Sequence, residues 1–297
     1  MADKSRPLHI KETSLTHKMT IPEKILSESF ANFDLDIYSE GAIVREINTE
    51  QVMYHKNAFE KFYPASTTKI MTLLIAIENG DLDDIVTVCD EAGKVPRDSS
   101  LAYLSPGDQL TLRDLLYGLM IPSGNDAAVA IACHIAGSEK EFVAMMNEKA
   151  RSLGTMKTNF MNSHGYHHPD HYTTPYDLAL IMEEGAKNPV FREIIGAKEY
   201  HATITNRNGE EYERVWHCTN HALLEHSRYY IRELVGSKTG FTNEAKHTLV
   251  SLAEKNGYEY VAVVFEGERF ARYEDTKQLF QKAFETSAKL LTNAQRH

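Results

Sequence analysis

Two stretches near residue 50 alternate apolar and polar positions in the way that is typical of β-strands. They are Gly41–Ile47 and Gln51–Lys56, with the turn-like Asn48–Glu50 between them, so we expect a β-hairpin. An apolar run with helical spacing follows at Lys69–Asn79. We expect Gly80 to end this helix, because glycine commonly follows the last helical residue.

The middle of the chain has the apolar period of α-helices. Leu112, Leu115, Leu116 and Leu119 fall on one face of such a helix. Three more helices are expected, and each is marked by one of its ends: one stops at Gly137, one stops at Gly154, and one opens at Thr174, Pro175 and Asp177. The last of these has a threonine cap, a proline in the first turn and an acid three residues after the cap.

From about residue 200 the alternation of strands returns. Tyr200–Asn206 and Glu211–His217 flank a turn that contains Asn208 and Gly209, which indicates a second hairpin. Thr248–Ala253 and Glu259–Gly267 predict two further strands. The tail is expected to be an amphipathic helix with one apolar side, made of Phe280, Phe284, Ala288 and Leu291.

Strands therefore come from both ends of the chain, and helices fill the middle. We expect the two ends to meet in one mixed sheet, with a helical lobe at about residues 90–200 and a cleft between sheet and lobe. Residues 1–38 are polar and irregular, and we interpret them as a leader. Residues 39–293 are expected to form one catalytic domain, with no β-rich domain after it.

Composition and charge exclude some classes of function. The 297 residues include 32 Lys and Arg and 42 Asp and Glu, a net charge of −10, which disfavours nucleic acid as a partner. No apolar run is long enough to predict a transmembrane helix. The first 30 residues lack the apolar core of a signal peptide, so either the protein is cytosolic or an export signal has been removed.

The chain has three cysteines, Cys89, Cys133 and Cys218, which are far apart in the sequence. We expect all three to be free thiols, buried or half-buried.

The first candidate for chemistry is the sequence Ser66-Thr-Thr-Lys69 at the start of the first helix. Positions three apart share a helix face, so Lys69 is expected to approach the Ser66 hydroxyl. The positive field at a helix N-terminus and partial burial would both favour a neutral Lys69, which is then a base for a nucleophilic serine. The alternative is a serine cap with a solvated lysine, and this spacing alone does not decide between them.

Two further short motifs follow in the chain. Ser123-Gly124-Asn125 lies between two expected helices, where a tight turn would aim both polar side chains the same way. Lys238-Thr239-Gly240 precedes a strand pattern, and the glycine would let a ligand approach the backbone closely. Each motif alone is an ordinary loop. Together with the serine and lysine of the first helix, however, they form in order the set used by penicillin-binding proteins and class A β-lactamases.

At these residues the chain resembles the serine D-alanyl-D-alanine carboxypeptidases, the low-molecular-mass penicillin-binding proteins. The likeness covers roughly residues 38–290 and includes the segments around Tyr63–Thr72, Leu104–Ser138 and Asn162–Ile181. It implies an α/β fold of the α+β kind, the penicillin-binding protein and β-lactamase-like serine transferase fold. In that fold an antiparallel sheet is flanked by helices and joined by a helical lobe.

The resemblance also implies the catalytic roles. Ser66 would attack the carbonyl between the two D-alanines of a peptidoglycan stem peptide, with Lys69 as the general base. Ser123 and Lys238 would carry the proton to the departing D-alanine, and water would hydrolyse the acyl-enzyme. No metal or other cofactor is implied, and penicillin would acylate Ser66 as a slow substrate.

Substrate binding is implied at the same motifs. Asn125 would hold the substrate amide, and Lys238 and Thr239 would receive the terminal carboxylate beside Gly240. The backbone N–H groups of Ser66 and Phe241 would form the oxyanion hole. Relatives commonly carry an arginine before the Lys-Thr-Gly strand, and the candidates for it in this chain are Arg228 and Arg232.

Several alternatives remain open. A class A β-lactamase needs an acid between the second and third motifs, and the chain has no glutamate from Lys149 to Met182, which disfavours it. The same serine would also serve four other kinds of protein: an endopeptidase, a transpeptidase, a weak β-lactamase, or a wall-peptide or β-lactam sensor without turnover.

A zinc site is a further hypothesis for the segment His164–His171, although a polar loop is favoured there. The segment holds His164, His167, His168, Asp170 and His171. Because peptidoglycan lies outside the cytoplasm, we expect an exported, extracytoplasmic protein.

Overall fold

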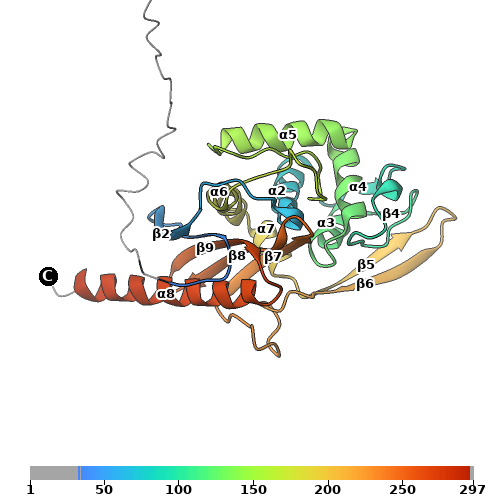
Figure 1. Ribbon diagram of the computed structural model, residues 1–297. Helices are drawn as coiled ribbons and strands as arrows, with labels where there is room; N and C mark the ends of the chain where they lie inside the picture. The colour runs from blue at the N-terminus through green and yellow to red at the C-terminus, as the bar shows by residue number, and fades with distance from the viewer. Residues whose placement is uncertain (1–32, 34, 295–297) are drawn as a thin grey trace, which may run out of the picture.

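The main sheet joins the two ends of the chain. The computed structural model describes residue 33 and residues 35–294, so most of the expected leader, residues 1–32 and 34, lies outside the described residues (Figure 1). Five strands form this sheet in the order β2-β1-β9-β8-β7. Their bounds are Gly41–Glu46 for β1, Gln51–Lys56 for β2, Leu234–Thr242 for β7, Lys246–Lys255 for β8 and Tyr258–Gly267 for β9.

The expected hairpin of β1 and β2 and the strand pair β8 and β9 are confirmed. The expectation of one mixed sheet is wrong in two respects. Every neighbouring pair of the main sheet is antiparallel. In addition, the hairpin near residue 210 belongs to a second sheet, with the order β3-β4-β5-β6.

The second sheet contains two short strands that the sequence pattern did not indicate. Its bounds are Ile85–Thr87 for β3, Gln109–Thr111 for β4, Glu199–Thr205 for β5 and Glu211–His217 for β6. The contact between β4 and β5 pairs Gln109 with Thr205. Alternation shows that a strand has an apolar face, but it does not identify the strand beside it, and runs of three residues are too short to show a period.

The expected helices are all present, together with one helix, Pro189–Gly196, that the sequence pattern did not indicate. Their bounds are Lys69–Asn79 for α2, Leu112–Met120 for α3, Asn125–Ala136 for α4, Glu139–Ser152 for α5, Pro175–Ala186 for α6, Pro189–Gly196 for α7 and Ala271–Ala294 for α8, with short 3₁₀ turns at Ala65–Thr68 (η1) and Ala92–Lys94 (η2). Thr174 caps α6 through the backbone N–H of Asp177, as the sequence predicts. Gly137 ends α4 in the left-handed conformation that favours glycine.

Helices cover both faces of the main sheet. In Figure 1, α8 runs along one face, while α2, α6 and α7 lie on the other beneath the rest of the lobe. Strand β9 is buried on both of its faces. Val261 and Val263 pack into the core on the side of the lobe, and Ala262 and Val264 pack into the core on the side of α8. This buries a nearly continuous apolar strand on two sides.

The apolar side of α8 is confirmed in part. Phe280 and Phe284 are buried against the sheet, whereas Ala288 is exposed and the side chain of Leu291 lies outside the described residues. Within the described part of the chain, no helix combines the length and the apolar character that crossing a membrane requires.

The expectation of three free cysteines is wrong. Cys89 and Cys133 form a disulfide with a Cα–Cα distance of 6.6 Å, while Cys218 is a free, half-buried thiol. The disulfide ties the segment before η2 to α4. Spacing along the chain does not show which helix packs on which loop, and only that packing brings the two sulfur atoms together.

Candidate active site

Ser66 lies in the 3₁₀ turn η1, which leads directly into α2. The sequence predicted a helix start at this point, and the structure adds a tighter turn before it. Lys69 follows as the first residue of α2, and its Nζ lies 3.2 Å from Ser66 Oγ. The side-chain contact expected from a spacing of three residues is therefore present.

Lys69 is completely buried, and its amine has two further partners. Its Nζ donates to Asn125 Oδ1 at 2.7 Å and to the backbone carbonyl of His164 at 2.7 Å. Burial lowers the pKa of this amine well below its usual value, and the nearby charge of Lys238 lowers it further. The neutral form of Lys69 is thus favoured by the environment in which the fold places it.

The partners of Lys69 also orient the neutral amine. A neutral amine has two N–H bonds and one lone pair, and both Asn125 Oδ1 and the His164 carbonyl are acceptors only. They take the two N–H bonds, so the lone pair is left to face the hydroxyl of Ser66. This arrangement is suited to removing a proton from Ser66.

The second motif meets the third across the cleft. Ser123 has a positive φ of 63°, a conformation that a residue other than glycine adopts rarely, and Lys238 Nζ donates to its Oγ at 2.9 Å. The same amine donates to the Thr239 carbonyl at 2.9 Å. Burial lowers the pKa of Lys238 to about 7, so this amine is close to half-protonated at neutral pH.

Gly240 allows strand β7 to lie directly against the turn that carries Ser66. A Cβ at this position would be 2.4 Å from Thr248 Oγ1, 2.9 Å from the Ser66 backbone nitrogen and 3.0 Å from the Pro64 carbonyl. The next residue, Phe241, is 52% exposed, and its ring stacks on His247 with the ring centroids 4.5 Å apart. Only glycine fits at the crossing of β7 and η1 without displacing one of them.

A cleft of about 760 Å³ opens over these groups, and Ser66, Ser123, Asn125, Thr239 and Gly240 all contribute to its wall. Tyr166 and His167 border it on the side of the lobe, and Phe241 borders it on the side of the sheet. Lys69 lies behind the wall, in contact with Ser66. The structure therefore brings the residues of the three sequence motifs together at one cleft.

Arg272 is a charged residue of the cleft that the sequence interpretation missed. Arg272, the second residue of α8, donates from Nη1 to the Gly240 carbonyl at 3.1 Å and to His247 Nδ1 at 3.2 Å. The same guanidinium and burial lower the pKa of His247 to about 4, with burial the larger cause. Arg272 Nε is buried without a hydrogen-bond partner among the described residues.

The two arginines proposed from the sequence lie elsewhere. Arg228 is exposed and pairs with Glu274, and Arg232 lines a different cleft beside α8. Neither of these two arginines borders the cleft that holds Ser66. In the chain, Arg272 comes after the Lys-Thr-Gly strand β7 and the hairpin of β8 and β9. Because α8 packs on the sheet, Arg272 nevertheless contacts β7.

The histidines of the segment His164–His171 have roles within the fold. His171 Nε2 is 2.8 Å from Thr68 Oγ1, and its Nδ1 accepts from the Met161 backbone N–H at 3.1 Å. His164 is also buried, while His168 is half-buried. In the described part of the chain, no three His, Cys, Asp or Glu side chains gather as metal ligands would.

Comparison with known proteins agrees with the motifs. The model of the family described as D-alanyl-D-alanine carboxypeptidase matches residues 27–269. A D-alanyl-D-alanine carboxypeptidase of Bacillus subtilis is 35% identical over 232 residues, which are 76% of this chain and 57% of that protein. One from a Streptomyces strain is 34% identical over 260 residues, 84% of this chain and 88% of that protein. The chain thus spans little more than half the length of the Bacillus relative.

Solved structures show the same fold. A Streptomyces DD-transpeptidase superposes with a TM-score of 0.79 at 32% identity, covering 86% of this chain and all of that one. A D-alanyl-D-alanine carboxypeptidase from Mycobacterium tuberculosis has a TM-score of 0.76 at 27% identity and covers 87% of this chain and 95% of its own. The α+β architecture expected from the sequence is confirmed by these likenesses.

Proposed function

Because this chain belongs to the D-alanyl-D-alanine carboxypeptidase family, we propose that it removes the terminal D-alanine from peptidoglycan stem peptides through an acyl-enzyme on Ser66. The observation that carries the proposal is the position of Lys69. Its buried amine has both N–H bonds engaged and its lone pair left for Ser66. A serine with such a partner is an activated nucleophile.

In the first step Ser66 Oγ bonds to the carbonyl carbon of the peptide bond between the two D-alanines. The Ser66 proton passes to Lys69 Nζ, and the carbonyl oxygen takes up the negative charge. The backbone N–H groups of Ser66 and Phe241 stabilise this oxyanion, and the close approach of Gly240 to Ser66 supports that pairing. One such donor typically contributes about 10²–10³ in rate.

In the second step the bond to the departing D-alanine breaks. Its nitrogen needs a proton, which Ser123 supplies from Lys238, and their 2.9 Å contact supports this route. A pKa of about 7 suits Lys238 for giving and regaining a proton at neutral pH. Water then attacks the ester on Ser66 and passes its proton through Ser123 to Lys238. As the ester bond breaks, Lys69 returns its proton to Ser66 Oγ and the shortened peptide leaves.

The substrate is held by groups on both walls of the cleft. Asn125 binds the substrate amide, and Lys238 and Thr239 receive the terminal carboxylate beside Gly240. Arg272 replaces Arg228 and Arg232 as the second cation for that carboxylate, because it is half-buried, borders the cleft and has a nitrogen, Nε, without a hydrogen-bond partner among the described residues. No cofactor enters this mechanism.

Transfer of the acyl group to an amine is a second candidate reaction. The Streptomyces structure that superposes on this chain is named a DD-transpeptidase, and both reactions share the acyl-enzyme. An endopeptidase, a weak β-lactamase and a sensor without turnover differ from these only after acylation. β-Lactams are the expected covalent inhibitors.

The proposed substrate also bears on location and organisation. Peptidoglycan lies outside the cytoplasm, so we propose that the native protein acts on the cell-wall side of the membrane. Residues 39–293 are proposed as one catalytic domain that includes the helical lobe at about residues 90–200.

The test is the intact mass of the protein after incubation with benzylpenicillin, together with D-alanine release from a D-Ala-D-Ala peptide. We expect one covalent adduct and sustained release for the wild type, and neither for Ser66→Ala. The control is Ser152→Ala, an exposed serine on α5 outside the cleft, which should behave like the wild type. An adduct that survives Ser66→Ala refutes the nucleophile, and an adduct without release supports a sensor.

A further inference from the structure

Residues Asn162–Tyr166 form a short segment that lies against the turn carrying Ser66. Gly165 has a positive φ of 86°, and a Cβ there would be only 1.8 Å from the Ala65 carbonyl oxygen. The segment therefore touches the residue that precedes the nucleophile, and only glycine fits at the contact. Its His164 carbonyl is the second acceptor for Lys69 Nζ. None of the three motifs includes this segment.

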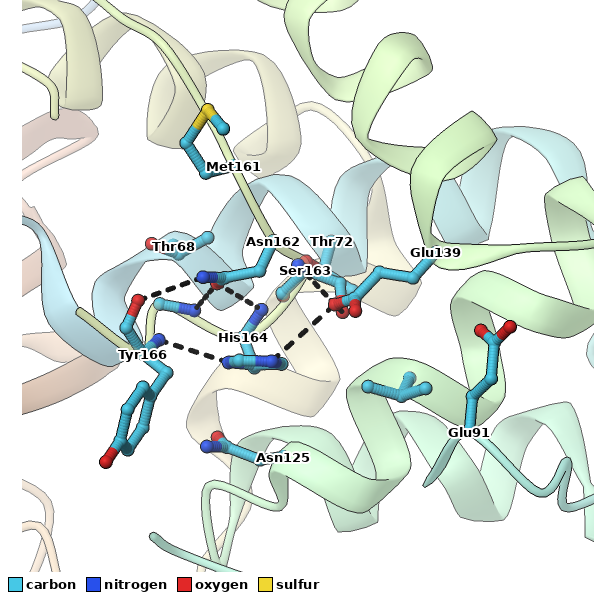
Figure 2. A network of polar contacts seen from close by, with 12 residues as sticks. Thr68, Thr72, Glu91, Asn125, Glu139, Met161, Asn162, Ser163, His164 and Tyr166 are labelled. Carbon is cyan, nitrogen blue, oxygen red and sulfur yellow. Dashed lines mark hydrogen bonds and ion pairs between the residues drawn. The ribbon is translucent and has the colours of Figure 1, made fainter. Parts of the chain in front are cut away.

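Glu139, the first residue of α5, fixes this segment from the side of the lobe. Its Oε1 accepts from the Ser163 backbone N–H at 2.9 Å and from Ser163 Oγ at 2.7 Å. The same oxygen lies 3.6 Å from Nε2 of His164 (Figure 2). One carboxylate thus contacts two consecutive residues of the segment, and the second of them carries the carbonyl that Lys69 uses.

The protonation of His164 follows from its contacts. Its Nδ1 accepts from the Tyr166 backbone N–H at 3.1 Å, so the ring proton of neutral His164 is on Nε2 and faces Glu139. Burial lowers the pKa of His164 to about 3, and the charge of Lys69 acts in the same direction. The ring is therefore neutral, and its N–H points toward the carboxylate.

Other side chains hold the same segment on its remaining sides. Asn162 Oδ1 accepts from the Gly165 backbone N–H at 2.7 Å, and its Nδ2 donates to the Tyr166 carbonyl at 2.9 Å, as Figure 2 shows. Thr72 of α2 donates to the Ser163 carbonyl. The position of the His164 carbonyl is thus determined by side chains, and Glu139 supplies the charged one.

We propose that Glu139 is a positioning residue for the general base: it fixes the His164 carbonyl and thereby turns the lone pair of Lys69 toward Ser66. The inference rests on the proposed function, because it assigns Lys69 the role of base. Without Glu139 the segment loses two hydrogen bonds and the facing charge for His164. The carbonyl then moves, and Lys69 Nζ is no longer held in one orientation.

The test measures the rate of Ser66 acylation by benzylpenicillin as a function of pH for wild type, Glu139→Ala, Glu139→Gln and Glu141→Ala. Glu141 is the matched control, since it lies in the same first turn of α5 with an exposed side chain. We expect the maximal rate of Glu139→Ala to fall about 10–100-fold, as expected for a reacting group displaced by about 1 Å. Glu139→Gln should lie between it and the wild type, and Glu141→Ala should match the wild type.

The pH profile separates positioning from general loss of structure. Loss of a fixed carbonyl acceptor disfavours the charged amine of Lys69, so the rise in rate with pH should begin at lower pH in Glu139→Ala. Lys238 on β7, Asp126 on α4 and His171 also act on the charge of Lys69, and all are retained in these variants. Misfolding would lower the maximal rate and leave the midpoint in place.

Three outcomes decide the matter. If the wild type is not acylated, the proposed function fails. If the wild type is acylated and Glu139→Ala matches Glu141→Ala in rate and pH profile, only the role of Glu139 fails. Should Glu139→Ala not fold, Glu139→Gln carries the test, and a wild-type rate with a wild-type profile in that variant overturns the inference.

Discussion

Lys238 on β7 donates a hydrogen bond to Ser123 Oγ at 2.9 Å, although 115 residues separate the two in the chain. Ser123 belongs to the loop before α4, and Lys238 belongs to the edge strand of the main sheet. The contact joins the helical lobe to the sheet directly beside Ser66. Lys238 is therefore both a part of the proposed proton route and a buried amine whose ionisation bears on stability.

Lys238 should make folding stability depend on pH. Its pKa is about 7 in the folded protein and near 10.5 when unfolded, so the unfolded state binds more protons between these values. Its contribution to the free energy of unfolding should therefore rise as pH increases from about 7 to 10. Lys238→Met should be more stable than the wild type near pH 7, by a few kcal/mol at most, and should lose that part of the pH slope. Urea unfolding at pH 7 and 9.5 measures both effects.

Replacing Lys69 by methionine should abolish most acylation without unfolding the protein. A general base contributes typically about 10²–10⁴ in rate, so the rate of penicillin labelling should fall by that factor. Lys94→Met, at an exposed position in η2, is the control and should label normally. Undiminished labelling of a folded Lys69→Met protein would contradict the role of the amine.

Arg272 should distinguish substrates by their terminal charge. Arg272→Ala should lower kcat/KM for a peptide ending in a carboxylate by about 10–100-fold, the usual magnitude of a charge-assisted hydrogen bond. The loss should be much smaller with a C-terminally amidated peptide, on which the guanidinium meets no negative charge. Arg228→Ala is the matched control, because that arginine is exposed and pairs with Glu274. Equal losses on both peptides would point to a structural role instead.

Gly240→Ala should separate β7 from the turn of Ser66. The new methyl group would lie 2.4 Å from Thr248 Oγ1 and 2.9 Å from the Ser66 nitrogen, so one of the two elements must shift. We expect acylation to fall by about 10²-fold or more while the circular dichroism spectrum stays that of the wild type. Gly137→Ala is the comparison: it strains a left-handed residue at the end of α4 but meets no neighbouring atom, and it should acylate normally.

The disulfide should contribute measurably to stability. Cys89 and Cys133 are 44 residues apart, and closing a loop of that length restricts the unfolded chain by about 4 kcal/mol in the chain-entropy model. Cys133→Ala should therefore lower the free energy of unfolding, and reducing agent should lower it for the wild type and for Cys218→Ala but not for Cys133→Ala. Cys218→Ala serves as the control, since Cys218 forms no disulfide. Identical denaturation of oxidised and reduced wild type would contradict the pairing.

Local chemistry was largely predictable from the order of residues. The period of apolar positions located the helices other than α7 and most strands, because a side chain on a helix or strand repeats its environment every 3.6 or 2 residues. The capping bond between Thr174 and Asp177 and the contact between Ser66 and Lys69 were both predictable, since the members of each pair are three residues apart. Contacts at this spacing depend on the local helical turn and not on how distant elements pack.

Other features depended on contacts between distant elements. Three such contacts join segments that are 24 or more residues apart: Arg272 with β7, Cys89 with Cys133, and Glu139 with Ser163. The apolar period shows which side of an element is buried, but it does not show which other element packs against that side. The chain by itself therefore determined which groups are available for chemistry. The packing of lobe against sheet decided how they are oriented, because a lone pair has a direction only when the amine's other partners are in place.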